Sequence, residues 1–285
     1  MIFALWLLAP VGLVLAVGLG LSFYMTRRHH LTEIHNPAEY GLDFEDIAFQ
    51  ATDGLALRGW FIPAIGSERA VLILHGHGGS MDFDVFRARY LHAAGFNVMM
   101  FDFRAHGRSE GRKATFGYLE RRDVLGAVAF LNSQGMKRIG ALGFSYGGIA
   151  AALSAPICPD IAAVITDGVP ARIRTAIAAY CVEIGLPRWL SPFVAWLALI
   201  AASLRLGVNL FHYEPIRWVG KIAPRPILFI HGGQDQYCPE FDDLYAQAQP
   251  PKELWRVPEA GHTKVDALFP DEHQRRIVEF FERTL

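Results

Sequence analysis

The chain has 285 residues, a formal net charge of −1 and 52% hydrophobic residues. The 27 basic and 28 acidic side chains nearly cancel, which argues against the strongly basic surface of a nucleic-acid-binding protein. The length suits one large domain or two small ones. Three cysteines without close spacing, Cys158, Cys181 and Cys238, are not a disulfide framework and favour a reducing compartment. No metal-binding spacing of His or Cys occurs, so we expect neither a metal nor a cofactor.

The N-terminus is apolar, and residues 2–24 contain no charged side chain. As a helix this run would be roughly 34 Å long, enough to cross a hydrocarbon core of about 30 Å. We therefore predict a transmembrane anchor over residues 1–26. A cleaved signal peptide is the alternative, but the run has no basic start and no Ala-x-Ala site. Two arginines follow the run, so the positive-inside rule puts the remaining chain on the cytoplasmic side.

A linker is expected over residues 27–43 and a catalytic domain over 44–285. Two β-like runs, 44–51 and 55–62, flank Asp53-Gly54, a strong hairpin signal. From residue 70 onward, short apolar runs alternate with helical patterns. The predicted strands are 44–51, 55–62, 70–74, 96–101, 139–142, 161–166, 227–230 and 253–257, and the predicted helices are 83–94, 115–133, 240–248 and 271–283. This alternation predicts an α/β protein with a mostly parallel eight-stranded sheet and helices on both faces.

One insertion interrupts the alternation, at about residues 170–222, where no strand is evident. Helical patterns over 172–182 and 190–206 suggest a lid above the carboxyl edge of the sheet. The second pattern is apolar on every side, so it must be buried against protein or lipid. We predict that Trp196 and Leu199 on this helix contact the substrate, with a buried packing helix and a membrane contact as the alternatives.

A serine in a sharp turn is the main chemical signal. Gly143-Phe144-Ser145-Tyr146-Gly147 connects the apolar run 139–142 to an apolar helical stretch. A strand, a strained turn and a helix make the context in which Gly-x-Ser-x-Gly becomes a nucleophile elbow. The following helix points its free N–H groups and positive dipole end at the serine.

Other motifs follow other strands, at the edge where parallel sheets bind ligands. His75-Gly76-His77-Gly78-Gly79 resembles the loop that supplies an oxyanion-hole N–H, with His77 as the donor and Tyr146 supplying the other N–H. The elbow resembles that of the α/β-hydrolase superfamily, and three further stretches are similar to its motifs. These are Asp102-Phe103-Arg104-Ala105-His106-Gly107-Arg108-Ser109, in which Ala105 replaces the usual glycine, then Ile230-His231-Gly232-Gly233-Gln234-Asp235, and Ala260-Gly261-His262. The nearest branch is similar to membrane-anchored esterases and lipases.

The resemblance implies a triad of Ser145, Asp235 and His262. Chemistry agrees, because a serine needs a base and a histidine base needs an acid to orient it. Asp167 also follows a strand and is the rival acid, although it precedes the insertion. Structural roles are expected for His106, His273, Asp102 and Arg104, and packing for Cys238.

We therefore predict a serine hydrolase that cleaves carboxylic esters or thioesters of an apolar, lipid-like acyl substrate. The alternatives are an amidase or peptidase with the same triad, and a catalytically silent membrane-tethered binding protein on this fold. An aspartate-dependent dehalogenase is disfavoured, because serine stands at position 145.

Overall fold

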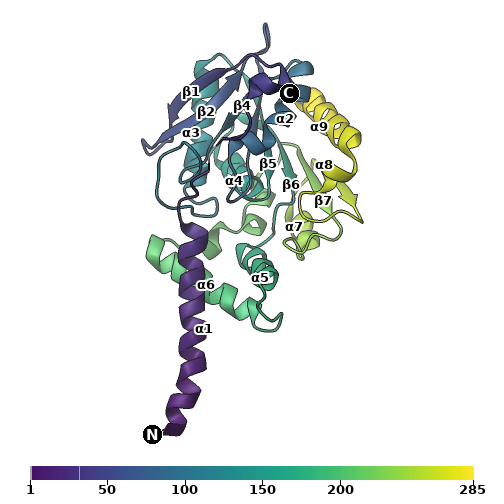
Figure 1. Ribbon diagram of the computed structural model, residues 1–285. Coiled ribbons are helices and arrows are strands. Elements are labelled where there is room, and N and C mark those ends of the chain that lie inside the picture. The colour runs from purple at the N-terminus through teal and green to yellow at the C-terminus, as the bar shows by residue number, and fades with distance from the viewer. Residues whose placement is uncertain (1, 32) are drawn as a thin grey trace.

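One eight-stranded sheet forms the centre of the protein, with the order β1-β2-β4-β3-β5-β6-β7-β8 (Figure 1). The computed structural model describes residues 2–31 and 33–285, with side chains from residue 12 onward apart from residue 32. The strands are β1 (Glu45–Gln50), β2 (Ala56–Ile62), β3 (Arg69–Leu74), β4 (Asn97–Phe101), β5 (Arg138–Phe144), β6 (Ile161–Asp167), β7 (Ile227–Gly232) and β8 (Lys252–Val257). The pairs β1–β2 and β2–β4 are antiparallel and the other pairs are parallel. The mostly parallel sheet predicted from the sequence is confirmed.

Helices cover both faces of this sheet. The α-helices of the described part of the chain are α1 (Ile2–Thr26), α2 (Val85–Ala93), α3 (Glu120–Ser133), α4 (Tyr146–Ser154), α5 (Ile173–Glu183), α6 (Ser191–Leu206), α7 (Phe241–Gln247), α8 (Val265–Leu268) and α9 (Pro270–Thr284). Side chains alternate along the buried strands: in β3, Leu72 and Leu74 belong to one hydrophobic core, and Val71 and Ile73 to the other. The first core contains α3, α4 and α7 and the second contains α2 and α9, so α3 and α9 lie on opposite sides of the sheet (Figure 1).

The carboxyl ends of the central strands lie level with one another. Leu74 of β3 pairs with Gly143 of β5, Phe144 pairs with Asp167 of β6, and Asp167 pairs with Ile230 of β7. The loops that follow these strands therefore meet at one edge of the sheet, which is where the predicted site residues come together.

The helix α3 begins five residues later than predicted. Phe116 and Gly117 have φ values of 51° and 92°, which an α-helix cannot contain. The buried Glu120 carboxylate accepts hydrogen bonds from the N–H groups of Thr115 and Gly117, at 2.9 and 2.8 Å, and holds this turn in place. The predicted hairpin is present, and Gly54 at its turn has a φ of 83°.

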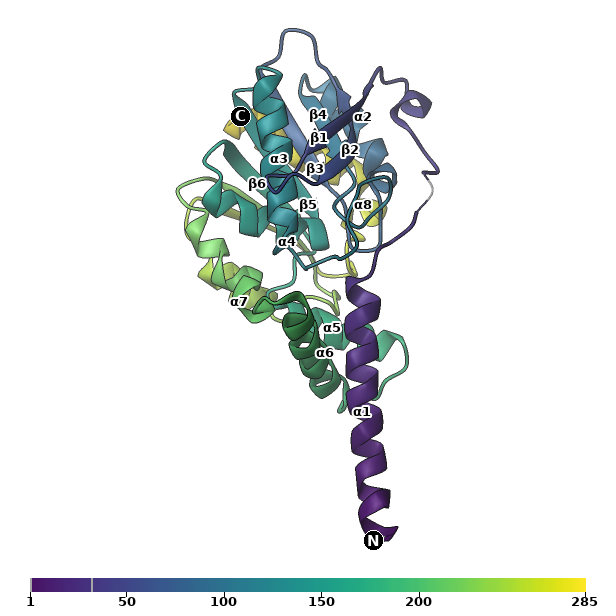
Figure 2. The same cartoon turned by 90° about the vertical axis from the view of Figure 1, so that its left-hand side faces the viewer.

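The insertion between β6 and β7 contains α5, α6 and several short 3₁₀ helices. In both views α5 and α6 lie at the carboxyl edge of the sheet, at the end from which α1 extends (Figures 1 and 2). The helix α6 contacts both α5 and α1. Its inner side is buried, whereas Phe193 and Trp196 are exposed.

The predicted N-terminal helix is present as α1, but its C-terminal end is packed against the rest of the protein. Leu21 and Met25 are buried in the core that contains α6. Across the residues that the structure describes, no helix has the length and apolar character needed to cross a membrane. The transmembrane span predicted over residues 1–26 is thus not found, and the side chains of residues 1–11 within it lie outside the described part.

Candidate active site

Ser145 occupies a strained turn between β5 and α4. Its φ and ψ are 50° and −108°, a region that few residues other than glycine enter. A Cβ on Gly143 would lie 2.4 Å from the carbonyl oxygen of Gly147, and a Cβ on Gly147 would lie 2.0 Å from that of Leu74. Only glycine fits at these two positions, so the sequence around Ser145 produces the sharp turn that the motif predicts.

The structure brings Ser145, His262 and Asp235 into one chain of hydrogen bonds. The Nδ1 atom of His262 lies 2.8 Å from Oδ2 of Asp235, and its Nε2 atom lies 2.8 Å from Oγ of Ser145. Because a carboxylate only accepts, Nδ1 carries the proton in a neutral ring and Nε2 is free to accept from the serine hydroxyl. Asp235 is fully buried and also accepts from the N–H of Tyr237, whereas the His262 side chain is 22% exposed.

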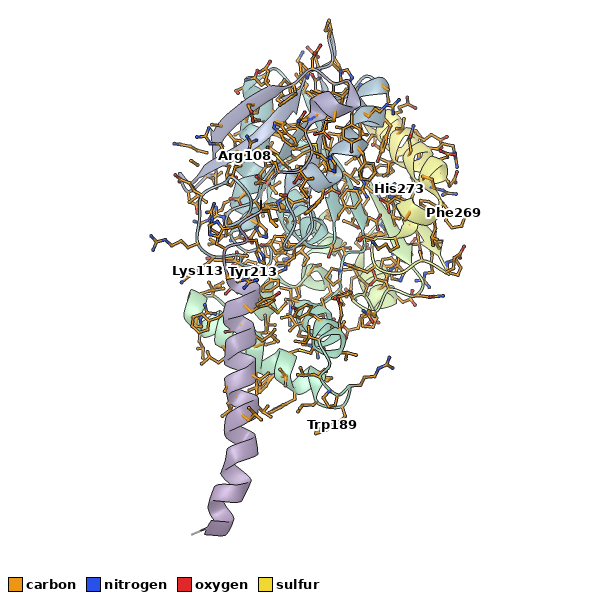
Figure 3. All side chains as sticks on the ribbon, in the orientation of Figure 1. Arg108, Lys113, Trp189, Tyr213, Phe269 and His273 are labelled. Carbon is orange, nitrogen blue, oxygen red and sulfur yellow. The ribbon has the colours of Figure 1, made fainter. Side chains whose placement is uncertain are left out.

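Other candidates from the sequence are engaged elsewhere. Asp167 binds Nε2 of His273 at 3.1 Å, and the label in Figure 3 places His273 on α9. Asp102 accepts from the N–H groups of Met81 and Arg108 at 3.0 and 2.8 Å. Asp102 thus ties two loops together, and Asp167 joins β6 to α9.

Two further residues from the sequence also have structural contacts. Arg104 binds the carboxylates of Asp53 and Asp123. The buried Cys238 thiol donates to the Gly168 carbonyl at 3.3 Å. Its Sγ and the ligand atoms of Asp235 and His262 lie within 4.8 Å of one another. Burial raises the pKa of this thiol well above its usual value, and Asp235 and His262 already bind each other, so the group is poorly suited to a metal.

The two predicted oxyanion-hole residues both lie beside Ser145. His77 follows β3, and Tyr146 is the first residue of α4, so its N–H has no carbonyl partner four residues earlier in the helix. His77 belongs to residues 75–79, hereafter the His77 loop. The ring of His77 stacks on Phe116 with centroids 5.7 Å apart, and its Nε2 donates to the carbonyl of Met25 at 2.9 Å.

The neutral imidazole rings of His75 and His106 form hydrogen bonds that hold the His77 loop in place. His75 donates from Nδ1 to the Gly76 carbonyl and accepts at Nε2 from the N–H of Phe103. His106 donates from Nδ1 to the Arg104 carbonyl and accepts at Nε2 from the N–H of Gly78, at 3.4 Å. Burial lowers the pKa of both imidazoles, and also the pKa of His77. Each ring therefore keeps one donor and one acceptor nitrogen, which fixes its tautomer.

A cavity of about 530 Å³ opens beside Ser145. Its apolar lining comes mainly from one face of α5, namely Ile173, Ala176, Ile177 and Tyr180, together with Met25, Phe116 and Ile149. Glu183, Tyr237 and Lys264 add polar groups to the lining. The spacing i, i+3, i+4, i+7 within the predicted helix 172–182 was a usable signal for this face. Nothing in the sequence indicated Met25, which comes from α1.

Trp196 and Leu199, predicted as substrate contacts, do not line this cavity. Leu199 is fully buried in the core that α6 shares with α5 and α1. Trp196 is 45% exposed and stacks on Phe193. Trp189, in the α5–α6 connection, is 80% exposed and lies at the outer end of the insertion (Figure 3). The helix α6 thus lies behind α5, and α5 forms the cavity wall.

Most of the chain is similar in sequence to a known protein family and to proteins from bacteria. The model of the alpha/beta hydrolase family matches residues 71–280. The uncharacterized protein YfhR of Escherichia coli O157:H7 is 30% identical over 240 residues, which cover 80% of this chain and 76% of that protein. YqkD of Bacillus subtilis, also uncharacterized, is 27% identical over 240 residues, with coverages of 80% and 76%.

Solved structures are similar over most of the chain. The Pyrococcus furiosus esterase Pf2001 superposes with a TM-score of 0.77 and 27% identity, covering 91% of this chain and 98% of that one. An esterase from Exiguobacterium antarcticum has a TM-score of 0.62 at 17% identity, over 84% of this chain and all of that one, a likeness of fold alone. The stretch matched by the family model contains Ser145, Asp235 and His262.

Proposed function

Because this chain belongs to the alpha/beta hydrolase family, we propose that it is a serine hydrolase that cleaves carboxylic esters or thioesters. The observation that carries the proposal is the hydrogen-bonded chain from Ser145 through His262 to Asp235 at the wall of an open cavity. The similarity to a solved esterase supports the same reaction class.

In the proposed reaction Ser145 is the nucleophile. Its hydroxyl proton passes to Nε2 of His262 as Oγ attacks the acyl carbonyl. The buried Asp235 carboxylate keeps Nδ1 protonated and stabilises the imidazolium that forms. His262 then gives its proton to the departing alcohol or thiol, and a water molecule activated by the same imidazole hydrolyses the acyl-enzyme.

The negative charge on the carbonyl oxygen needs donors that are already in place. The backbone N–H groups of Tyr146 and His77 fit this role, since both residues line the cavity beside Ser145. The N-terminus of α4 adds its positive dipole end. A fixed pair of donors stabilises the transition state more than the substrate, which is what accelerates the reaction.

The lining of the cavity suits an apolar acyl group. Ile173, Ile177 and Phe116 present hydrocarbon to the space beside Ser145. In this proposal, α5 takes the role of the lid that is predicted from the sequence for the whole insertion. We infer a preference for apolar acyl chains over charged ones, because burying each CH₂ group contributes about 0.8 kcal/mol.

A fluorophosphonate probe tests the serine-hydrolase proposal directly, since it labels an activated serine covalently. The wild-type protein should be labelled and should hydrolyse p-nitrophenyl butyrate, whereas Ser145→Ala should lose both properties. Loss of a triad member typically reduces turnover by about 10⁴- to 10⁶-fold. Ser133→Ala is the matched control, because Ser133 is exposed and bonds only within α3. Near-normal hydrolysis by a folded Ser145→Ala protein would disprove the proposal.

A further inference from the structure

We propose that the last turn of α1 positions the oxyanion-hole N–H of His77, with the Met25 carbonyl as the fixing contact. The inference rests on the proposed function and makes His77 a positioning residue through its side chain. Met25 and Thr26 lie before residue 71, where the family match begins. The N-terminal helix would thus supply part of the catalytic site from outside the matched region.

The contact between Met25 and His77 is direct. Nε2 of His77 donates to the Met25 carbonyl at 2.9 Å, and the face of the same ring stacks on Phe116. One contact restrains the ring at its edge and the other at its face. Because the ring and the oxyanion-hole N–H belong to the same residue, fixing the ring restrains the backbone rotation that would move this N–H.

The end of α1 is itself held firmly. Nη1 of Arg205, on α6, lies 3.0 Å from Oγ of Ser22 and 3.3 Å from Oγ1 of Thr26. The Thr26 carbonyl accepts from the N–H of Ala114 at 3.0 Å. These contacts hold the end of α1 that presents the Met25 carbonyl to His77.

The chain just after α1 is bound in the same way. His29 exchanges backbone hydrogen bonds with Ala105 and Gly107, at 2.7 and 3.2 Å. The Arg28 guanidinium donates to the Gly111 carbonyl at 2.7 Å. Arg28 and His29, predicted as part of a linker, are thus joined to the loop after β4, and this loop carries His106, the acceptor for Gly78 of the His77 loop.

Placement of an oxyanion donor has a large effect on rate. Removal of one donor costs about 10²- to 10³-fold in turnover, and a shift of about 1 Å costs about 10²-fold. Loosening the His77 loop should therefore lower kcat by about 10- to 100-fold. The effect on KM should be small, because the ground-state substrate depends less on the oxyanion contact.

The first experiment compares His77→Leu with His77→Gln in the full-length protein. Leucine has no donor for the Met25 carbonyl, whereas the glutamine amide places an N–H at a similar reach. With p-nitrophenyl butyrate, we expect His77→Leu to lose about 10- to 100-fold in kcat and His77→Gln to recover to within about fivefold of wild type. His92→Leu is the control, because His92 on α2 also donates to a backbone carbonyl, that of Pro63, and does not line the cavity beside Ser145.

A trifluoromethyl ketone inhibitor tests whether the His77 side chain positions the oxyanion-hole N–H or only fills space in the core. It forms a tetrahedral oxyanion on the serine, so its affinity should fall in His77→Leu by the same factor as kcat. Affinity for the product butyrate should stay within about threefold. Equal losses for both ligands, or equal behaviour of the Leu and Gln variants, would overturn the proposal. Inactivity of wild type itself would instead refute the proposed function.

A double-mutant cycle tests whether α1 is the source of the effect. Arg205→Met removes the contacts to Ser22 and Thr26 without touching the cavity, and should lower kcat by about threefold to tenfold. In the His77→Leu background the same change should have little further effect, since the link to α1 is already lost. Fully additive losses would show that α1 does not act through His77. Arg205→Met also provides the test if His77→Leu fails to fold.

Discussion

The described part of the chain contains two aspartate–histidine pairs, and they differ in their surroundings. Asp235 and His262 lie in loops after β7 and β8, and the free nitrogen of His262 meets Ser145 at 2.8 Å. Asp167 ends β6 and His273 lies on α9, with side-chain exposures of only 1% and 2%. The second pair joins a strand to a helix, and among the described residues neither of its side chains has a hydrogen bond to a hydroxyl.

An aspartate–histidine pair alone therefore does not create a reactive site. A base must present one ring nitrogen to a nucleophile and to solvent, and of these two histidines only His262 does this, with Nε2 2.8 Å from Oγ of Ser145 and a side chain that is 22% exposed. The Asp167 pair nevertheless supports the site indirectly, because the N–H of Ser145 donates to the Asp167 backbone carbonyl at 2.8 Å. The Asp235 pair is hydrogen-bonded to the proposed nucleophile, and the Asp167 pair joins α9 to the strand end that binds the Ser145 backbone.

The largest expected effect comes from Asp235→Asn. An amide in place of the carboxylate would favour the wrong tautomer of His262, so kcat should fall by about 10⁴-fold with little change in stability. Steady-state hydrolysis of p-nitrophenyl butyrate measures this loss. Asp243→Asn, at an exposed site on α7, is the control and should retain wild-type activity. A loss of less than about tenfold in Asp235→Asn would remove the distinction between the two pairs.

The sequence predicts the local structure around Ser145 well, because this structure depends on nearby residues. Gly143, Ser145 and Gly147 specify the elbow through backbone fit, and the strands around it follow from short apolar runs. The choice of Asp235 over Asp167 rested on chain order, and the structure gives the two carboxylates different histidine partners.

Contacts between distant segments could not be predicted in the same way. Apolar side chains on α5 and α6 look alike in sequence, and only their packing order places Ile177 at the cavity and Leu199 behind it. The hydrogen bond between Met25 and His77 joins residues 52 positions apart. The late start of α3 depends on the buried Glu120 carboxylate, whose partners are set by tertiary structure.

The second prediction is that Asp167→Asn affects stability rather than chemistry. Its Oδ2 accepts from His273, and its other oxygen is buried without a partner among the described residues. Disturbing this buried contact should cost about 1–3 kcal/mol of unfolding free energy. Thermal unfolding should show a Tm lower by about 2–4 °C per kcal/mol. The kcat of the folded protein should change by less than about fivefold, since the bond to the Ser145 N–H uses the backbone. A kcat as low as that of Asp235→Asn would place Asp167 in the reaction.

The third prediction concerns imidazoles that have no carboxylate partner. Burial, with smaller contributions from His77 and Arg27, lowers the pKa of His29 to about 4, and burial lowers that of His106 well below its usual value. The unfolded chain takes up these protons near pH 6.5, whereas the folded protein resists them. Stability should therefore be fully present above about pH 6.5 and fall as the pH drops toward 4, by up to about 1.4 kcal/mol per pH unit for each proton.

Urea unfolding at several pH values between 8 and 5 measures this slope. His29→Phe should reduce it, because the variant keeps an aromatic ring against His106, 4.8 Å away, and removes one titrating group. An unchanged slope in this variant would show that His29 does not contribute.

The smallest expected effect comes from a comparison of two helices, α5 and α6. Ile177 on α5 and Leu199 on α6 are both buried, at 2% and 0% exposure, but only Ile177 lines the cavity beside Ser145. Replacing either by alanine removes buried hydrocarbon and should cost about 2–5 kcal/mol of stability. The two alanine variants should nevertheless differ in their substrate selectivity. Two CH₂ groups of acyl chain correspond to about 1.6 kcal/mol, or roughly tenfold in kcat/KM, when they are buried against protein.

Ile177→Ala widens the cavity, so longer chains gain room while shorter ones lose contact. We expect the ratio of kcat/KM for octanoate over acetate p-nitrophenyl esters to change by about threefold to tenfold in Ile177→Ala and to stay at the wild-type value in Leu199→Ala. Both variants must be assayed well below their Tm, so that a loss of folded protein scales all substrates equally and cancels in the ratio. A shifted ratio in Leu199→Ala alone would mean that α6 reaches the acyl chain during turnover. Selectivity would then follow from a movement of the insertion rather than from the wall that α5 provides.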